Sequence, residues 1–181
     1  MTARIAPAQP PFPPDIQQRF DRIMPEGVPP LTLFTTLARD ARLFAHFSGG
    51  SLLSPGNLTL RQREIVVDRI TARSGSEYEW GVHVAFFGEA AGLTEAQIRS
   101  LTQGGANDPV WIDEERALLR ACDQLHNDCD IDDAGWQALQ AHFSETAILE
   151  ILMLAGFYRM VSYLTNALRL PLESYAARFP R

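Results

Sequence analysis

Apolar residues recur along most of the chain at the three- and four-residue spacing of helices. No stretch alternates apolar and polar residues between turns, as a half-buried strand would. From about Asp15 onward this pattern predicts eight or nine helices, the clearest at 31–39, 41–53, 60–73, 75–91, 95–103, 113–126, 133–142 and 145–168. We therefore predict an all-α fold.

Helix starts are marked by three Ser/Thr–Gln/Glu pairs with the spacing of the capping box, namely Thr59 with Gln62, Ser74 with Glu77, and Thr94 with Gln97. In this motif each side chain satisfies a backbone amide that the first helical turn leaves without a partner. The helix after Ser74 is short, and Gly92 provides a left-handed stop.

The first 14 residues differ from the rest of the chain, because five of them are proline. Proline at this density prevents helix and predicts an extended or disordered arm over residues 1–14, able to wrap a neighbouring subunit. The remaining residues, 15–181, are enough for one domain with its own core, and the hydrophobic fraction of 46% supports this.

Charge and cysteine content exclude several classes of function. The net charge of −6 and scattered arginines argue against a nucleic-acid partner. Two cysteines and the lack of a signal-like start favour a cytoplasmic location. The apolar stretch 147–168 approaches membrane-spanning length, but it contains Glu150, Arg159 and Asn166, which favours a buried helix over a membrane span.

One helix combines polar and aromatic side chains in a way that suggests chemistry. At 100° per residue, an arc of about 100° holds Ser76, Glu79, Trp80, His83 and Phe87, and the opposite arc is apolar. A helix of this kind is buried, so its ionisable groups need partners. Glu79 and His83 stand at i and i+4, and Glu64 on the preceding helix is the candidate third member.

Two interpretations of Glu64, Glu79 and His83 remain open from spacing alone. Two carboxylates around one imidazole form a coupled titrating group, with one acid held protonated near neutral pH, as proton transfer on a carbon acid requires. The same residues also suit a buried hydrogen-bond cluster that fixes helix packing. A metal site is not indicated, because the chain has no HExxH pattern and its other histidines are scattered.

The segments Arg63-Glu64, Gly75-Ser76-Glu77-Tyr78-Glu79-Trp80-Gly81-Val82-His83 and Ala91-Gly92-Leu93 resemble the carboxymuconolactone decarboxylase-like superfamily, which also includes alkylhydroperoxidase D. The resemblance extends over about residues 30–172. It implies an all-α fold of intertwined helices assembled as trimers or hexamers, or as dimers, with sites near subunit contacts.

In the alkylhydroperoxidase D branch, the matching helix carries a CxxC pair and a His four residues beyond it. In this chain Ser76 and Glu79 occupy the two cysteine positions, while His83 and Glu64 match the proton-relay residues. Serine cannot form a disulfide or sulfenic acid, and Cys122 and Cys129 lie in another segment. Thiol-based peroxidase chemistry at this position is therefore disfavoured.

The resemblance to the decarboxylase branch implies a cofactor-free acid/base enzyme that acts on a small carboxylated lactone or related acid. In it, His83 is the general acid/base, Glu64 and Glu79 set its protonation, and Ser76, Tyr78 and Trp80 contact the substrate. Arg159 is a further candidate for binding a substrate carboxylate, or alternatively a structural ion pair with Glu150 or a site carboxylate. A peroxide-defence relative and a non-catalytic small-molecule-binding protein are the alternative functions.

Overall fold

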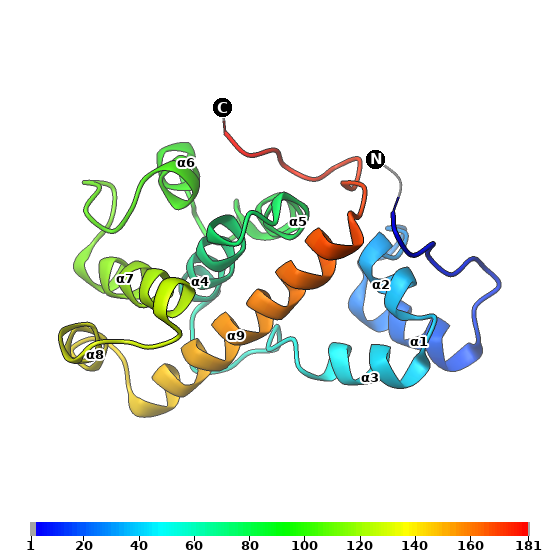
Figure 1. The fold of residues 1–181 in the computed structure, drawn as a ribbon, viewed down its shortest axis with the longest axis horizontal. Helices are drawn as coiled ribbons and strands as arrows, with labels where there is room; N and C mark the ends of the chain where they lie inside the picture. The colour runs from blue at the N-terminus through cyan, green and yellow to red at the C-terminus, as the bar shows by residue number, and fades with distance from the viewer. Residues whose placement is uncertain (1–2, 181) are drawn as a thin grey trace.

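The computed structural model describes residues 3–180, which form nine α-helices and no β-strand (Figure 1). The helices are α1 (Pro14–Ile23), α2 (Thr32–Leu37), α3 (Ala41–Gly49), α4 (Leu60–Arg73), α5 (Glu77–Phe87), α6 (Glu95–Gln103), α7 (Asp113–Asp128), α8 (Asp133–Gln140) and α9 (Glu145–Leu168). The all-α prediction is confirmed.

Helix α4 lies at the centre of the fold and packs against α5, α6, α7 and α9 (Figure 1). It begins at Thr59, whose hydroxyl accepts from the backbone amide of Gln62 while the Gln62 side chain accepts from the amide of Thr59. All residues from 64 to 71 are buried, so every side of the helix faces protein. The ionisable residues in this range therefore lose their hydration, and only a partner inside the core can offset that cost.

Helix α9 is the longest element and crosses the molecule diagonally (Figure 1). Its inner face contributes Ile151, Leu154 and Val161, all fully buried, to the main core. Among the described residues it is the one helix whose length and composition would allow it to cross a membrane. Its core-facing side accounts for part of that apolar composition, and exposed apolar residues such as Leu149 and Met153 account for another part.

The three N-terminal helices form a small layer with an aromatic cluster of their own. Ile16 and Phe20 from α1 pack on Phe44 from α3, separately from the main core. The described part of the proline-rich arm is extended and bonded to its own chain: the Arg4 amide donates to the Leu168 carbonyl at 2.8 Å and the Ala8 amide donates to the Thr35 carbonyl at 3.0 Å. Residues 1 and 2 of the predicted arm lie outside the described residues.

The structure corrects two details of the helix prediction. The predicted capping box of Ser74 is wrong, because Ser74 ends α4, Gly75 adopts a left-handed φ of 64°, and Ser76 is the residue that caps α5. Helix α3 ends at Gly49 rather than at residue 53. Glycine adopts the left-handed conformation at low steric cost, so Gly75 sets the boundary between α4 and α5.

Candidate functional site

The turn between α4 and α5 positions the candidate site. The Ser76 hydroxyl accepts from the Glu79 amide at 3.4 Å and also forms a 2.8 Å hydrogen bond with the hydroxyl of Thr165 on α9. Because Gly75 adopts its left-handed conformation immediately before this cap, the chain reverses and α5 packs against both α4 and α9. His83, two turns along α5, then faces the buried side of α4.

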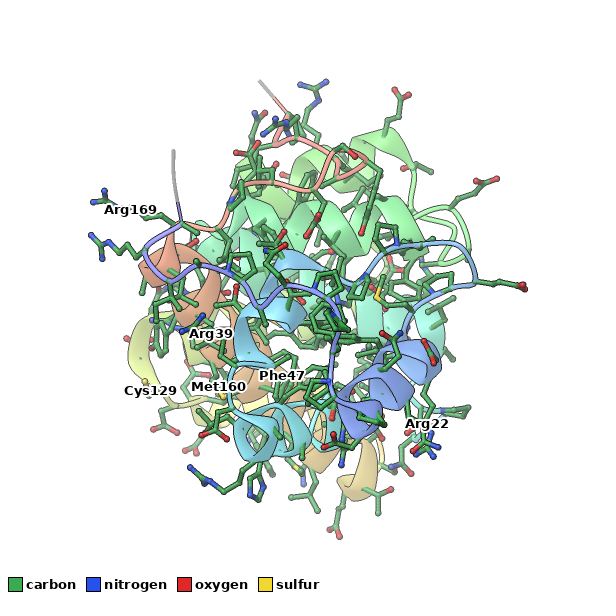
Figure 2. All side chains as sticks on the ribbon, turned by 90° about the vertical axis from the view of Figure 1, so that its right-hand side faces the viewer. Arg22, Arg39, Phe47, Cys129, Met160 and Arg169 are labelled. Atoms are coloured by element: carbon green, nitrogen blue, oxygen red, sulfur yellow. The ribbon has the colours of Figure 1, made fainter. Side chains whose placement is uncertain are left out.

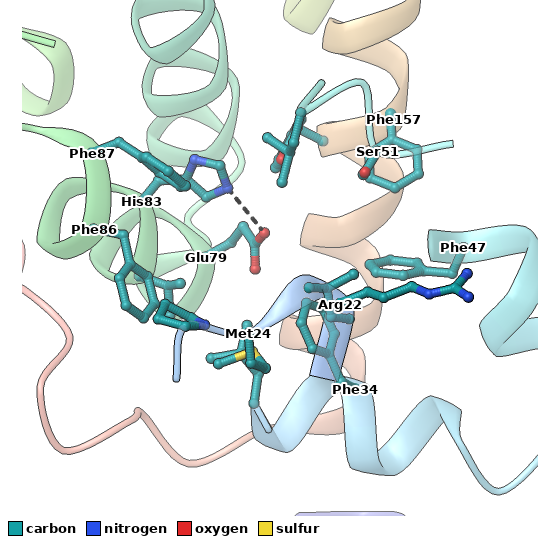
Figure 3. A pocket seen from close by; sticks show the side chains of 16 residues that line it. Arg22, Met24, Phe34, Phe47, Ser51, Glu79, His83, Phe86, Phe87 and Phe157 are labelled. Carbon is teal, nitrogen blue, oxygen red and sulfur yellow. Dashed lines mark ion pairs between the residues drawn. The ribbon is translucent and has the colours of Figure 1, made fainter. Parts of the chain in front are cut away.

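Glu64 on α4 and His83 on α5 are in direct contact, with Oε2 of Glu64 2.7 Å from Nδ1 of the imidazole. Glu79 lies one turn before His83, and its Oε1 is 3.6 Å from Nε2 of the ring (Figure 3). The exposed fractions of Glu64, Glu79 and His83 are 0%, 6% and 3%. The structure thus brings together the three residues that the sequence singles out.

The charge of Glu64 is balanced from two sides. Opposite the imidazole, Nε of Arg63 donates to Oε1 of Glu64 at 2.7 Å. A second Arg63 nitrogen donates to the carbonyl of Leu53 at 2.8 Å, and the guanidinium lies 5.2 Å from the centre of the Phe87 ring. A buried carboxylate needs this kind of pairing, since desolvation alone would make its charged form costly.

Two aromatic rings hold the imidazole in place. Tyr158 from α9 meets it edge-on, with ring centres 4.9 Å apart and an interplanar angle of 86°. Phe87 contacts it at 5.3 Å. With Nδ1 also bonded to Glu64, the ring has a single well-defined orientation and directs Nε2 toward Glu79.

Burial by itself would lower the pKa of His83, because the imidazolium loses its hydration. The charge and hydrogen bond of Glu64, together with the charge of Glu79, outweigh that effect and raise the pKa of His83 to about 10. His83 is therefore a cation at neutral pH and donates its Nδ1–H to Glu64.

Asp68 is a fourth ionisable residue in this region and was not among the predicted site residues. It stands one helical turn after Glu64 on α4, is fully buried, and neither carboxyl oxygen has a hydrogen-bond partner among the described residues. Desolvation, and then the charge of Glu64, raise its pKa well above the ordinary value, partly opposed by His83. Its i, i+4 spacing from Glu64 was the one signal that could have identified it.

A cavity of about 450 Å³ opens beside Glu79 and His83 (Figure 3). Its walls combine residues of the N-terminal layer with residues of α5 and α9. Six aromatic side chains line it: Phe34, Phe47, Phe86, Phe87, Phe157 and Tyr158. The ionisable side chains in the lining, besides that of Tyr158, are Glu79, His83 and Arg22. The cavity therefore has room for a small, largely apolar molecule next to a charged acid/base pair.

The four residues expected to bind substrate lie outside the lining of this cavity. Ser76 is buried as a helix cap, and Trp80 packs on Phe179 with ring centres 5.0 Å apart. The Tyr78 hydroxyl donates to Glu173 at 2.5 Å and accepts from the Leu33 amide at 3.1 Å, so it joins α5 to α2 and the C-terminal segment. These side chains stabilise the helix that carries His83.

Arg159 also lies outside the cavity lining. Its guanidinium contacts the His126 ring, and Nε donates to the Tyr163 hydroxyl at 3.0 Å. The expected ion pair with Glu150 or a site carboxylate is absent from the ion pairs of residues 3–180. Glu150 instead accepts hydrogen bonds from the backbone and side chain of Asn57. Helix periodicity placed Arg159 on a stripe but could not show which neighbour that stripe faces.

Neither cysteine belongs to the cavity lining. Cys122 is buried in α7, and burial together with the charge of Asp123 raises the pKa of its thiol to about 12. Cys129 is exposed and lies on the opposite flank of the molecule from Arg22, which lines the cavity (Figure 2). Across residues 3–180, no group of three or more His, Cys, Asp and Glu side chains has the arrangement of a metal site.

Comparison with known proteins connects this geometry to a family. The model of the carboxymuconolactone decarboxylase family matches residues 41–123, a range that includes Glu64, Asp68, Glu79 and His83. No curated protein matches the chain by sequence.

Solved structures share the fold at low sequence identity. An uncharacterized peroxidase-related protein from Silicibacter sp. TM1040 is 18% identical, with a TM-score of 0.84 over 99% of this chain and 96% of that chain. The debrominase Bmp8 in complex with 2,3,4-tribromopyrrole is 14% identical, with a TM-score of 0.80 over 97% and 94%. A peroxidase-related protein described as an alkylhydroperoxidase AhpD core, from Ralstonia eutropha JMP134, is 18% identical, with a TM-score of 0.76 over 95% of each chain.

Proposed function

Given that this chain belongs to the carboxymuconolactone decarboxylase and alkylhydroperoxidase D-like superfamily, we propose that it is a cofactor-free acid/base enzyme acting on a small carboxylated lactone or a related acid. One observation carries the proposal. A protonated imidazole, held between Glu64 and Glu79, lies in the wall of an aromatic cavity of about 450 Å³.

The proposed reaction is a decarboxylation. As the bond from the ring to the carboxylate breaks, its electron pair moves into the unsaturated carbonyl system of the lactone and carbon dioxide leaves. The resulting enolate takes a proton at carbon from Nε2 of His83. Solvent then returns a proton to the imidazole, so the reaction needs no oxidant, reductant or metal for its balance.

The surroundings of His83 suit this role. Glu64 fixes the orientation of the imidazole ring and compensates its positive charge until the proton is transferred to the substrate. Glu79 Oε2 is buried without a hydrogen-bond partner among the described residues, so it is available to a hydroxyl or amide proton of a bound molecule. Since both glutamates favour the charged imidazolium, proton transfer requires a strongly basic carbon intermediate, and an enolate generated by loss of carbon dioxide meets that requirement.

The peroxide-defence alternative has weaker support. The names of two structural neighbours refer to peroxidases. Their sequences are only 18% identical to this chain, so the similarity supports a shared fold and not a shared activity. In this chain Ser76 and Glu79 occupy the positions of the thiol pair, and the Cys122 thiol is buried with a raised pKa. A thiolate nucleophile is therefore lacking at the cavity.

Carbon dioxide release tests the proposal. Purified protein is incubated with carboxymuconolactone and with related unsaturated lactone acids, and the His83→Gln variant is compared with wild type. We expect turnover by wild type and a decrease of about 10²–10⁴-fold in kcat for the variant, the usual contribution of a general acid. His142→Gln, which changes an exposed histidine in the turn between α8 and α9, serves as the control. Equal rates for wild type and His83→Gln would remove His83 from the mechanism.

A further inference from the structure

The loop between α3 and α4, residues 50–59, forms one side of the cavity. Ser51 and Leu53 belong to the lining, and Ser51 lies beside Phe157 (Figure 3). Across the described residues, the backbone groups of 51–58 form no hydrogen bond with another backbone group. The loop therefore depends on side chains to keep it over the cavity.

Packing fixes the two ends of this loop but not its middle. Leu52 and Leu58 are half-buried against the main core, and Leu52 has a left-handed φ of 53°, a conformation that such a side chain rarely adopts. Residues 53–57 between them are exposed. This middle part has no apolar packing of its own to hold it, so its polar contacts decide where it lies.

Two side chains provide those polar contacts. Glu150 accepts hydrogen bonds from the backbone and side-chain nitrogens of Asn57 at 2.6 and 2.8 Å. Nη1 of Arg63 donates to the Leu53 carbonyl at 2.8 Å. Because Leu53 lines the cavity and Asn57 does not, Arg63 holds the part of the loop that a bound molecule would meet.

The same guanidinium also reaches the acid/base group. Nε of Arg63 bonds Oε1 of Glu64 at 2.7 Å, while Oε2 of that carboxylate lies 2.7 Å from Nδ1 of His83. The guanidinium also lies over Phe87, a ring of the cavity wall that contacts the imidazole. Arg63 itself is outside the lining, and its side chain is 12% exposed. It thus contacts the loop and the site without reaching the space for the ligand.

Arg63 and His83 share the charge of one buried carboxylate. A guanidinium bonded to Oε1 draws negative charge away from Oε2 and repels the imidazolium, so it favours loss of the His83 proton. The other ionisable groups around the imidazole carry a negative charge or none: Asp68 on α4, Glu79 on α5 and Tyr158 on α9. Among these neighbours Arg63 supplies the positive charge that opposes their effect.

We propose that Arg63 is a positioning residue that couples the loop over the cavity to the proton donor His83. With the loop in place, the guanidinium is fixed at Leu53 and at Glu64, and its charge remains on the carboxylate. When Leu53 moves away, the guanidinium loses one of these two contacts and Glu64 is left more fully to His83, which then holds its proton more firmly. This inference rests on the proposed function and adds that proton delivery is favoured when the loop encloses a ligand.

NMR of the protein without ligand tests both halves of this coupling. At pH 10, close to the pKa of His83 of about 10, the wild-type imidazole is about half protonated. We expect a larger imidazolium fraction in Arg63→Gln, equivalent to an acid dissociation constant about three- to tenfold lower. At pH 7 the backbone order parameters of residues 53–56 should decrease in the same variant.

Two further variants separate the coupling from a general loss of structure. Arg63→Lys keeps a positive charge, but its single ammonium lacks the rigid fork that bonds Glu64 and Leu53 together, so it should also lower the order parameters at pH 7. Arg61→Gln is the matched control. It removes another ion pair of α4, with Glu115 at 2.6 Å, and should leave His83 and the loop as in wild type.

An imidazolium fraction in Arg63→Gln equal to that of wild type would overturn the inference, as would a loop equally ordered in both Arg63 variants and wild type. The same changes in Arg61→Gln would overturn it too, because they would reflect any lost ion pair on α4. These outcomes are separate from turnover. Both expected changes without carbon dioxide release would reject the decarboxylase and retain the coupling, whereas carbon dioxide release with neither change would do the opposite.

Discussion

Nδ1 of His83 lies 2.7 Å from Oε2 of Glu64, although the residues belong to different helices and are 19 positions apart. This contact explains why the imidazole keeps its proton inside the core. Without a carboxylate beside it, a fully buried histidine would lose its charge, because desolvation disfavours the imidazolium.

The first prediction concerns the charge of His83. Glu64→Gln keeps the size of the side chain but removes its negative charge, so burial should prevail and the pKa of His83 should decrease from about 10. Titration of the imidazole resonances by NMR measures this change. Glu77→Gln, on the N-terminal turn of α5 and not bonded to His83, is the control. An unchanged His83 titration in Glu64→Gln would show that Glu64 does not control its charge.

The second prediction concerns the pH dependence of stability. The folded-state pKa of His83 is raised from 6.5 to about 10, so its charge contributes stability fully below pH 6.5. That contribution is lost progressively as the pH rises from 6.5 toward 10. The difference in unfolding free energy between wild type and His83→Gln, from urea titrations at pH 6, 8 and 9.5, should therefore shrink with increasing pH. A difference that stays constant would contradict the raised pKa.

The third prediction concerns Asp68. Its folded-state pKa is raised, so the cost of keeping it protonated, or of burying its charge, is absent below the unfolded pKa near 3.8 and grows as the pH increases. Asp68→Asn removes that titration, and its melting temperature should exceed that of wild type by more at pH 8 than at pH 5. Asp21→Asn changes an exposed acid and should alter stability by less than about 0.5 kcal/mol at either pH.

Equal stability of Asp68→Asn and wild type at pH 8 would mean that the Asp68 carboxyl is compensated in solution. A destabilised Asp68→Asn at both pH values would instead show that the carboxyl forms favourable interactions in solution. Either result would contradict the description of Asp68 as a buried acid without a partner.

The fourth prediction separates a capping role from a substrate-binding role for Ser76. Ser76→Ala removes the cap of α5 and the hydrogen bond to Thr165, and should cost about 1–2 kcal/mol in unfolding free energy. The matched control is Ser74→Ala, because the buried Ser74 hydroxyl has no partner among the described residues and its removal should cost little or nothing. Urea unfolding of the two variants provides the comparison, and equal losses would contradict the capping assignment.

The sequence by itself determined where most helices begin. Thr59 with Gln62 and Thr94 with Gln97 form the predicted capping boxes, and helices α4, α6 and α9 have the predicted bounds. These features depend on interactions within a few residues, so local pattern is sufficient to predict them. The requirement that a buried Glu79 and His83 have a partner also followed from the sequence, because it reflects the cost of burying charge.

Tertiary structure decided which side chains meet. Ser74 and Ser76 are both plausible caps by type, and the left-handed turn at Gly75 selected Ser76. Arg159 found His126 and Tyr163 rather than a carboxylate, because helix packing determines what each face of α9 contacts.

Tertiary structure also decided the protonation of the site and the outline of the cavity. A pKa depends on burial and on charges from all neighbouring elements, so the proton on His83 and the isolation of Asp68 could not be inferred from spacing along two helices. Arg22 is about 60 residues from His83 in sequence, and no local pattern connects them. Only the packing of the N-terminal layer against α5 and α9 places both in the walls of one cavity.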